Sequence, residues 1–137
     1  MGPVNWLAVG AAVVAALLAS ALWYGPLYGR ARRDEVGPGG LGSRHAPGRT
    51  LAISAVLLSV SASMMGHMFA RVGAETLSAK PWLYFMMSGG LAIAFVIPAL
   101  WTSYAHQRIS TRLALIDAGF WLFAYLSMGA VFWLVKA

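Results

Sequence analysis

The sequence contains no cysteine and only 4 acidic residues among its 137 residues. Without cysteine the chain has no disulfide, no thiolate nucleophile and no Cys-ligated metal site. The apolar segments also lack the pair of carboxylates or the nucleophile and base that catalysis would need. We therefore expect a protein that is not an enzyme and that holds no cofactor.

Charges of either sign are scarce, at 10% of the chain, whereas apolar residues make up 60%. The mean hydropathy of +0.71 is too high for a soluble domain of this size. The 10 Lys and Arg residues lie in the connecting segments and at the ends of the apolar stretches, where they would meet anionic lipid headgroups. The expected partner is therefore the lipid bilayer, with anionic lipid at the cytoplasmic face, and not a nucleic acid.

Four long apolar stretches occupy most of the chain, at residues 4–24, 51–70, 81–104 and 113–135. Roughly 20 helical residues cross the ~30 Å hydrocarbon layer, and a helix satisfies its own backbone there. The first stretch has no Lys or Arg before it, so we interpret it as an uncleaved span and not as a signal peptide. The sequence predicts an all-α fold, a four-helix transmembrane bundle that forms a single membrane domain over residues 1–137.

The basic residues predict the orientation of the bundle. Residues 25–50 and 105–112 hold seven Lys and Arg residues, against three on the opposite face. Since cytoplasmic loops carry the excess of positive charge, both segments are expected in the cytoplasm and both termini outside. The segment 25–50 has seven glycines and three prolines, so we interpret it as a flexible linker without regular structure whose arginines contact lipid. A short interfacial helix at Arg30 to Arg33 is an alternative for part of it.

A short similarity links the two halves of the chain. Ala21-Leu22-Trp23 followed by Arg30 has the same spacing as Ala99-Leu100-Trp101 followed by Arg108. One interpretation is a parallel duplication that produces tandem two-helix hairpins, as in some transporters. The other is chance combined with the common need for an interfacial tryptophan and a cytoplasmic arginine.

Small residues form one face of the first predicted helix. Ala8, Ala12, Ala16 and Ser20 recur at four-residue spacing, and such faces let helices approach closely in lipid. The contact is either inside the bundle or between copies of the chain.

Ser59, Ser63, His67 and Arg71 follow one another at four-residue spacing in the second predicted helix. Because lipid solvates such groups poorly, we expect this stripe to face protein. His67 either bonds to a neighbouring backbone carbonyl or acts as a proton carrier or ligand.

His67 also stands among methionines, and thioether and imidazole ligands suit Cu(I). The candidate copper ligands are His67, Met64, Met68 and Met86. Methionine is equally an ordinary filler of gaps between helices, and this second interpretation is the preferred one.

Asp117 is the only acidic residue within a predicted span. A lipid-facing carboxylate would cost up to a few kcal/mol, so its side chain must point inward. Its predicted partners are Thr102, Tyr104, His106, Ser54 and Arg112, in either a structural hydrogen-bond network or a proton relay.

Pro98 lies within the third predicted helix and cannot donate to the carbonyl of Ala94. We expect a kink at this position.

Several short motifs resemble those of the small bacterial membrane family called domain of unknown function 1761. The more specific ones are the Trp-Tyr-x-Pro end of the first helix and the Ile-Asp start of the fourth. The matching residues are Asn5-Trp6, Leu22-Trp23-Tyr24-Gly25-Pro26, Phe95, Pro98, Thr102, Ile116-Asp117, Gly119 and Met128. The resemblance implies a four-helix, multi-pass protein of the bacterial inner membrane with an uncharacterised function, and it transfers no catalytic residue.

Two classes of function remain after these exclusions. The first is a non-catalytic bundle that forms a homo-oligomer or serves as an accessory subunit of a larger membrane complex. The alternative is a small-solute or proton-coupled transporter, with Cu(I) handling as a third option. A water-accessible cavity that reaches Asp117 would favour the transporter, and a dry, packed interior would favour the bundle.

Overall fold

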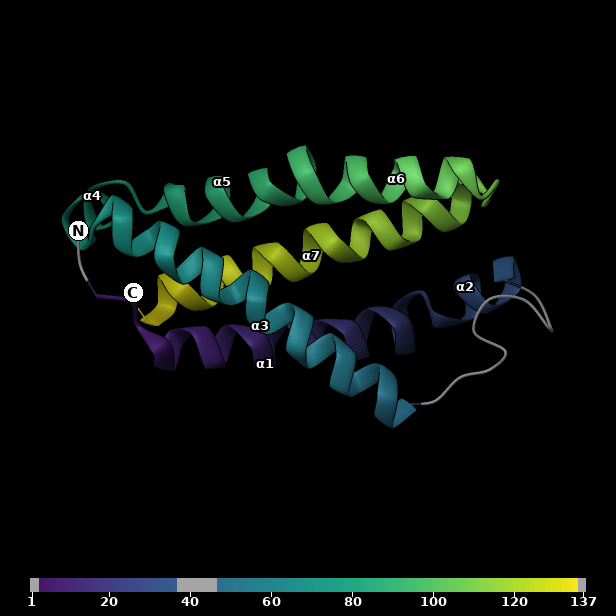
Figure 1. Ribbon diagram of the computed structural model, residues 1–137, viewed down its shortest axis with the longest axis horizontal. Coiled ribbons are helices and arrows are strands. Elements are labelled where there is room, and N and C mark those ends of the chain that lie inside the picture. Colours follow the sequence, from purple (N-terminus) through teal and green to yellow (C-terminus); the bar gives the residue numbers. More distant parts are fainter. Residues whose placement is uncertain (1–2, 37–46, 136–137) are drawn as a thin grey trace.

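The computed structural model describes residues 3–36 and 47–135, which contain helices and no strand. Four helical stretches are long and apolar enough to cross a membrane, namely Trp6–Leu27, Gly48–Val72, Trp82–His106 and Thr111–Val135. The predicted all-α fold with four membrane spans is confirmed. The two ends of the chain lie at the same end of the bundle (Figure 1). Which end faces the cytoplasm stays a prediction.

The first span ends in a π-helical turn, and the third span contains one between two α-helical segments. In chain order the elements are α1 (Trp6–Leu22), η1 (Trp23–Leu27), α2 (Gly29–Val36), α3 (Pro47–Val72), α4 (Ala74–Ala79), α5 (Trp82–Leu91), η2 (Ala92–Val96), α6 (Ile97–His106) and α7 (Thr111–Val135). Segment 25–50 was expected to lack regular structure, and this is wrong at both of its ends. The alternative of a short helix at Arg30 to Arg33 corresponds to α2, whereas the run Gly37 to Gly40 lies outside the described residues.

Each π-helical turn accompanies a proline. Pro26 lies inside η1, and the amide of Tyr28 bonds to the carbonyl of Trp23, five residues back, at 2.8 Å. η2 ends just before Pro98, where the amide of Ile97 bonds to the carbonyl of Ala92, again five residues back. Proline lacks an amide hydrogen and its ring crowds the preceding turn, which a locally wider turn relieves. The disturbance expected at Pro98 therefore takes the form of a π-helical turn.

α7 is the central helix of the bundle. It packs on α1 along one side and on α5 and α6 along the other (Figure 1). α3 packs mainly on α1, and it diverges from α1 and α7 toward its own N-terminal end (Figure 1). The bundle is therefore closed at the end with the termini and wider at the end with α2.

The small face of α1 lies inside a single chain. Ala8, Ala12 and Ala16 are all 0% exposed, whereas Ser20 is only partly buried. Of the two alternatives for this face, packing within the bundle is the one that the structure has.

A glycine makes a similar close approach between α5 and α7. A Cβ atom added to Gly129 would lie 2.8 Å from the carbonyl oxygen of Tyr84 and would also meet the Ser88 side chain. Small residues therefore set the helix spacing on both sides of α7, as is usual in membranes.

Candidate functional site

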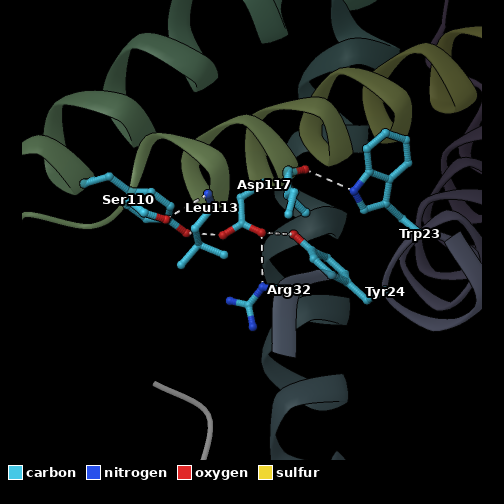
Figure 2. A network of polar contacts seen from close by, with 8 residues as sticks. Trp23, Tyr24, Arg32, Ser110, Leu113 and Asp117 are labelled. Atoms are coloured by element: carbon cyan, nitrogen blue, oxygen red, sulfur yellow. Dashed lines mark hydrogen bonds and ion pairs between the residues drawn. The ribbon is translucent and has the colours of Figure 1, made fainter. Parts of the chain in front are cut away.

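The Asp117 carboxylate is the centre of a polar network at the α2 end of the bundle. Asp117 is 3% exposed, and it lies at the end of the second turn of α7, ~9 Å from the first residue of that helix. Its Oδ1 accepts hydrogen bonds from the Tyr24 hydroxyl at 2.7 Å and from Arg32 Nε at 3.2 Å. Its Oδ2 accepts a hydrogen bond from the Tyr104 hydroxyl. Three donors from three segments thus meet one buried carboxylate (Figure 2).

The turn η1 brings two consecutive aromatic residues to two consecutive residues of α7. Trp23 Nε1 donates to the carbonyl of Ile116 at 3.0 Å, next to the bond from Tyr24 to Asp117 (Figure 2). The Trp23 ring packs on Gly119, where an added Cβ atom would approach the ring to 2.8 Å. The π-helical turn at Pro26 then redirects the chain into α2, which carries Arg32.

Arg32 neutralises the carboxylate electrostatically. Its side chain is 34% exposed, and its guanidinium also lies 5.4 Å from the centre of the Tyr24 ring. Partial burial disfavours the charged guanidinium, but the adjacent Asp117 carboxylate outweighs this and raises the pKa of Arg32 above its ordinary value. Arg32 therefore stays charged at any physiological pH.

A second link ties α2 to the start of α7. Glu35 accepts a hydrogen bond from the Ser110 hydroxyl at 2.7 Å and pairs with Arg112 at 3.4 Å. The Ser110 hydroxyl also accepts the amide hydrogen of Leu113 at 3.1 Å (Figure 2), so the same residue caps α7. α2 is thus held against α7 at two separate points.

A pocket of about 580 Å³ adjoins this network, between α2, α3 and α7. Its volume lies within the usual range of small-molecule sites. Its lining combines cationic, hydroxyl and apolar side chains: Ser20, Tyr24, Gly29, Arg32, Arg33, Thr50, Ser54, Leu57, Leu58, Tyr104, Asp117, Phe120 and Trp121. Asp117 is one of the lining residues, and Leu57, Leu58, Phe120 and Trp121 form an apolar wall.

The structure brings together some of the partners predicted for Asp117 and not others. Tyr104 donates to Asp117, and Ser54 lines the adjoining pocket. Thr102 is exposed and its carbonyl bonds to the His106 ring, while Arg112 pairs with Glu35. The prediction of these last three residues as partners of Asp117 is wrong, because Tyr24, Arg32 and Tyr104 donate to its two oxygens instead.

Tyr24 and Arg32 were missed as partners of Asp117. Arg32, which was expected to contact lipid with the other arginines of its segment, pairs with this carboxylate. One signal in the sequence pointed to Tyr24. The Trp-Tyr-x-Pro and Ile-Asp motifs that carry the family resemblance are the two segments whose residues meet here.

The polar stripe of α3 lies at the margin of the bundle and not inside it: Ser59 and Ser63 are half-buried, and the exposed His67 ring lies edge-on to Trp6 of α1 at 5.7 Å. Ser59 donates to its own helix, at the Ala55 carbonyl, and the exposed His67 ring bonds to the Ser63 carbonyl at 2.7 Å. A helix can satisfy these groups internally, which allows them to face lipid. His67 thus takes the first of its two alternatives, a bond to a backbone carbonyl.

The methionines around His67 are spread over different surfaces. Met64 is 60% exposed on α3 and Met86 is 53% exposed on α5, whereas Met68 is partly buried. Among the described residues, no group of three or more His, Cys, Asp or Glu side chains has metal-binding geometry.

Comparison with known proteins places the chain in a family. No curated protein and no solved structure matches it. One family model matches residues 7–133, and its description reads protein of unknown function (DUF1761). The match covers nearly the whole chain and all four spans, so the protein belongs to the DUF1761 family.

Proposed function

We propose that this protein is a non-catalytic membrane protein that binds a small molecule in the pocket beside Asp117, as a small-solute transporter does. The observation that carries this proposal is the pocket of about 580 Å³ that reaches the buried carboxylate. Such a cavity was the feature expected to separate a transporter from a dry, packed bundle. Among the described residues the lining holds one carboxylate and no histidine, which supports binding over acid–base catalysis.

The surroundings of Asp117 argue against a proton-coupled version of this function. Tyr24, Tyr104 and Arg32 all donate to the carboxylate, so three protein donors already occupy both of its oxygens. Arg32 also supplies the opposite charge, at 3.2 Å. We therefore assign Asp117 the role of holding η1 and α2 to α7 at the edge of the pocket.

A second candidate function is association with another copy or with a larger membrane complex. The small face of α1 no longer favours it, because Ala8, Ala12 and Ala16 are buried within one chain. What favours it is the partly uncovered polar stripe of α3, where Ser59, Ser63 and His67 line a shallow hollow. Polar side chains in membrane spans usually face protein or water, so a partner would suit this surface.

The location follows from the same features. Four apolar spans indicate a multi-pass membrane protein. The bacterial inner membrane, with the Asp117 end in the cytoplasm, is our proposal from the excess of arginine in the loops at that end.

Blocking the pocket tests the proposed function. Ser54 lines the pocket on α3, and Val56, which is 65% exposed and does not line the pocket, serves as the matched control. We expect the wild-type protein and Val56→Trp to retain a bound small molecule through purification. Ser54→Trp should lose this molecule. Mass spectrometry of solvent extracts from equal amounts of folded protein measures this. An identical set of retained molecules in all three proteins would contradict the proposal.

A further inference from the structure

We propose that the ligand of this pocket is an anionic glycerophospholipid, with its phosphate at Arg33 and an acyl chain along the apolar wall. The inference rests on the proposed function, because it names the molecule that the pocket takes. Three observations carry it: an unbalanced positive charge, a lining that changes from polar to apolar with depth, and a side opening beside α3.

The first observation is the charge of the pocket. Asp117 and Arg32 balance one another at 3.2 Å. Arg33, the next residue, lines the same pocket and has no ion-pair partner among the residues that the structure describes. The lining therefore has one uncompensated positive charge, and a guanidinium binds phosphate through directed, charge-assisted hydrogen bonds.

The second observation is the order of the lining residues along α3. Thr50, Ser54 and Leu58 all line the pocket, and they lie ~3, ~9 and ~15 Å from the start of this span at Gly48. The hydroxyl groups thus stand nearer the membrane surface, and Leu58 stands deeper, among the acyl chains. On α7, Trp121 similarly lies one turn deeper than Asp117. A soluble anion would use only the outer part of such a pocket, whereas a phospholipid matches both parts.

The third observation is access from the side. The N-terminal half of α3 diverges from α1 and α7 (Figure 1), and the pocket lies where it does so. Leu57 lines the pocket and is 60% exposed, so the apolar wall continues to the outer surface of the bundle. A lipid can therefore enter from the bilayer with its chain still in hydrocarbon.

Native mass spectrometry of the purified protein in neutral detergent tests the proposal, with palmitoyl-oleoyl phosphatidylglycerol and the matching phosphatidylcholine as probes. We expect one tightly bound phosphatidylglycerol, preferred over phosphatidylcholine by about tenfold or more. Arg33→Gln should weaken this binding about tenfold. The control is Arg30→Gln, which removes the same charge from the same helix at an exposed residue that does not line the pocket. It should change the affinity by less than about twofold.

Three results would overturn the lipid assignment. If Arg33→Gln and Arg30→Gln weaken phosphatidylglycerol binding equally, the lipid is attracted by the overall positive charge of α2 and not by a site at Arg33. Displacement of the lipid by soluble glycerol phosphate at comparable concentration would mean a site for small phosphoesters. The wild-type protein could bind no phosphatidylglycerol while Ser54→Trp loses some other retained molecule. The proposed function would then stand, but with a different ligand. If Ser54→Trp changes neither the set of retained small molecules nor the binding of phosphatidylglycerol, the proposed function is wrong as well.

Discussion

Asp117 is surrounded by groups that donate to it, and this determines what the residue does. The hydroxyls of Tyr24 and Tyr104 and the guanidinium of Arg32 converge on one carboxylate that is 3% exposed. A buried carboxylate is stable only when hydrogen bonds and an opposite charge replace its water. The network therefore stabilises the fold only while all of its members are present.

Removing the acceptor should destabilise the protein more than removing its charge. We expect Asp117→Leu to lower the free energy of unfolding by about 2–4 kcal/mol, because Arg32 and two hydroxyls lose their acceptor. Asp117→Asn keeps an acceptor and should lower it by only about 1 kcal/mol. Thermal unfolding of protein in nanodiscs, followed by tryptophan fluorescence, measures both changes.

Asp34 provides the control, because it is an exposed aspartate on α2, and Asp34→Leu should melt like the wild-type protein. A similar melting temperature for Asp117→Leu and Asp34→Leu would contradict the structural role. So would an Asp117→Asn variant that melts normally but loses a pH-dependent flux in liposomes, since that result indicates a proton relay.

At the scale of elements, the smallest side chains decide which helices touch. Ala12 and Ala16 of α1 are fully buried, and on α3 an added Cβ atom at Gly66 would lie 2.8 Å from Val9. Close approach of backbones in lipid depends on such residues because packing contacts, and not the hydrophobic effect, hold membrane helices together. Larger side chains on the opposite side of α1 face outward, as Val14 and Leu18 do at 56% and 65% exposure.

Enlarging the small face of α1 should therefore damage the fold and leave the assembly state unchanged. We expect Ala12→Leu with Ala16→Leu to lower the free energy of unfolding by about 2–6 kcal/mol, since overpacking costs about 1–3 kcal/mol for each site. Native mass and thermal unfolding measure the two effects. The matched control is Ala11→Leu with Val14→Leu, on the exposed face. It should change neither the free energy of unfolding nor the native mass. A folded double variant at Ala12 and Ala16 with a reduced oligomer mass would show instead that this face lies between protomers.

Proline has the same local effect in two elements. The glycine-rich stretch after the first span begins with a π-helical turn and α2, and the third span passes Pro98 through η2. In both cases a proline removes one backbone bond, and the helix widens locally to recover the others. Proline disfavours the helical conformation at these positions, but the surrounding packing and the lack of water preserve the helix.

At the scale of the whole molecule, four spans place both ends of the chain on one side of the membrane. The other side carries α2 and the connection between α6 and α7, with most of the arginines. The positive-inside rule predicts that this side is cytoplasmic.

Cysteine labelling tests this orientation in a chain that has no cysteine of its own. Glu75 and Gln107 are exposed residues at opposite ends of the bundle. In intact cells an impermeant maleimide should label Glu75→Cys and leave Gln107→Cys unlabelled, and both should react once the membrane is opened. The reverse pattern in intact cells would invert the topology and place the Asp117 pocket outside.

The sequence by itself determined the all-α class, the four spans and the inward position of Asp117. These features follow from local quantities, namely the length and hydropathy of each stretch and the cost of a carboxylate in lipid. Only the tertiary structure decided which groups meet Asp117, because Arg32 and Tyr24 lie 85 and 93 residues away along the chain. No spacing rule relates residues on different helices, and their meeting depends on how α1, η1 and α2 pack on α7. The pocket likewise exists only because α3 diverges from its neighbours, and the geometry of helix contacts sets that divergence.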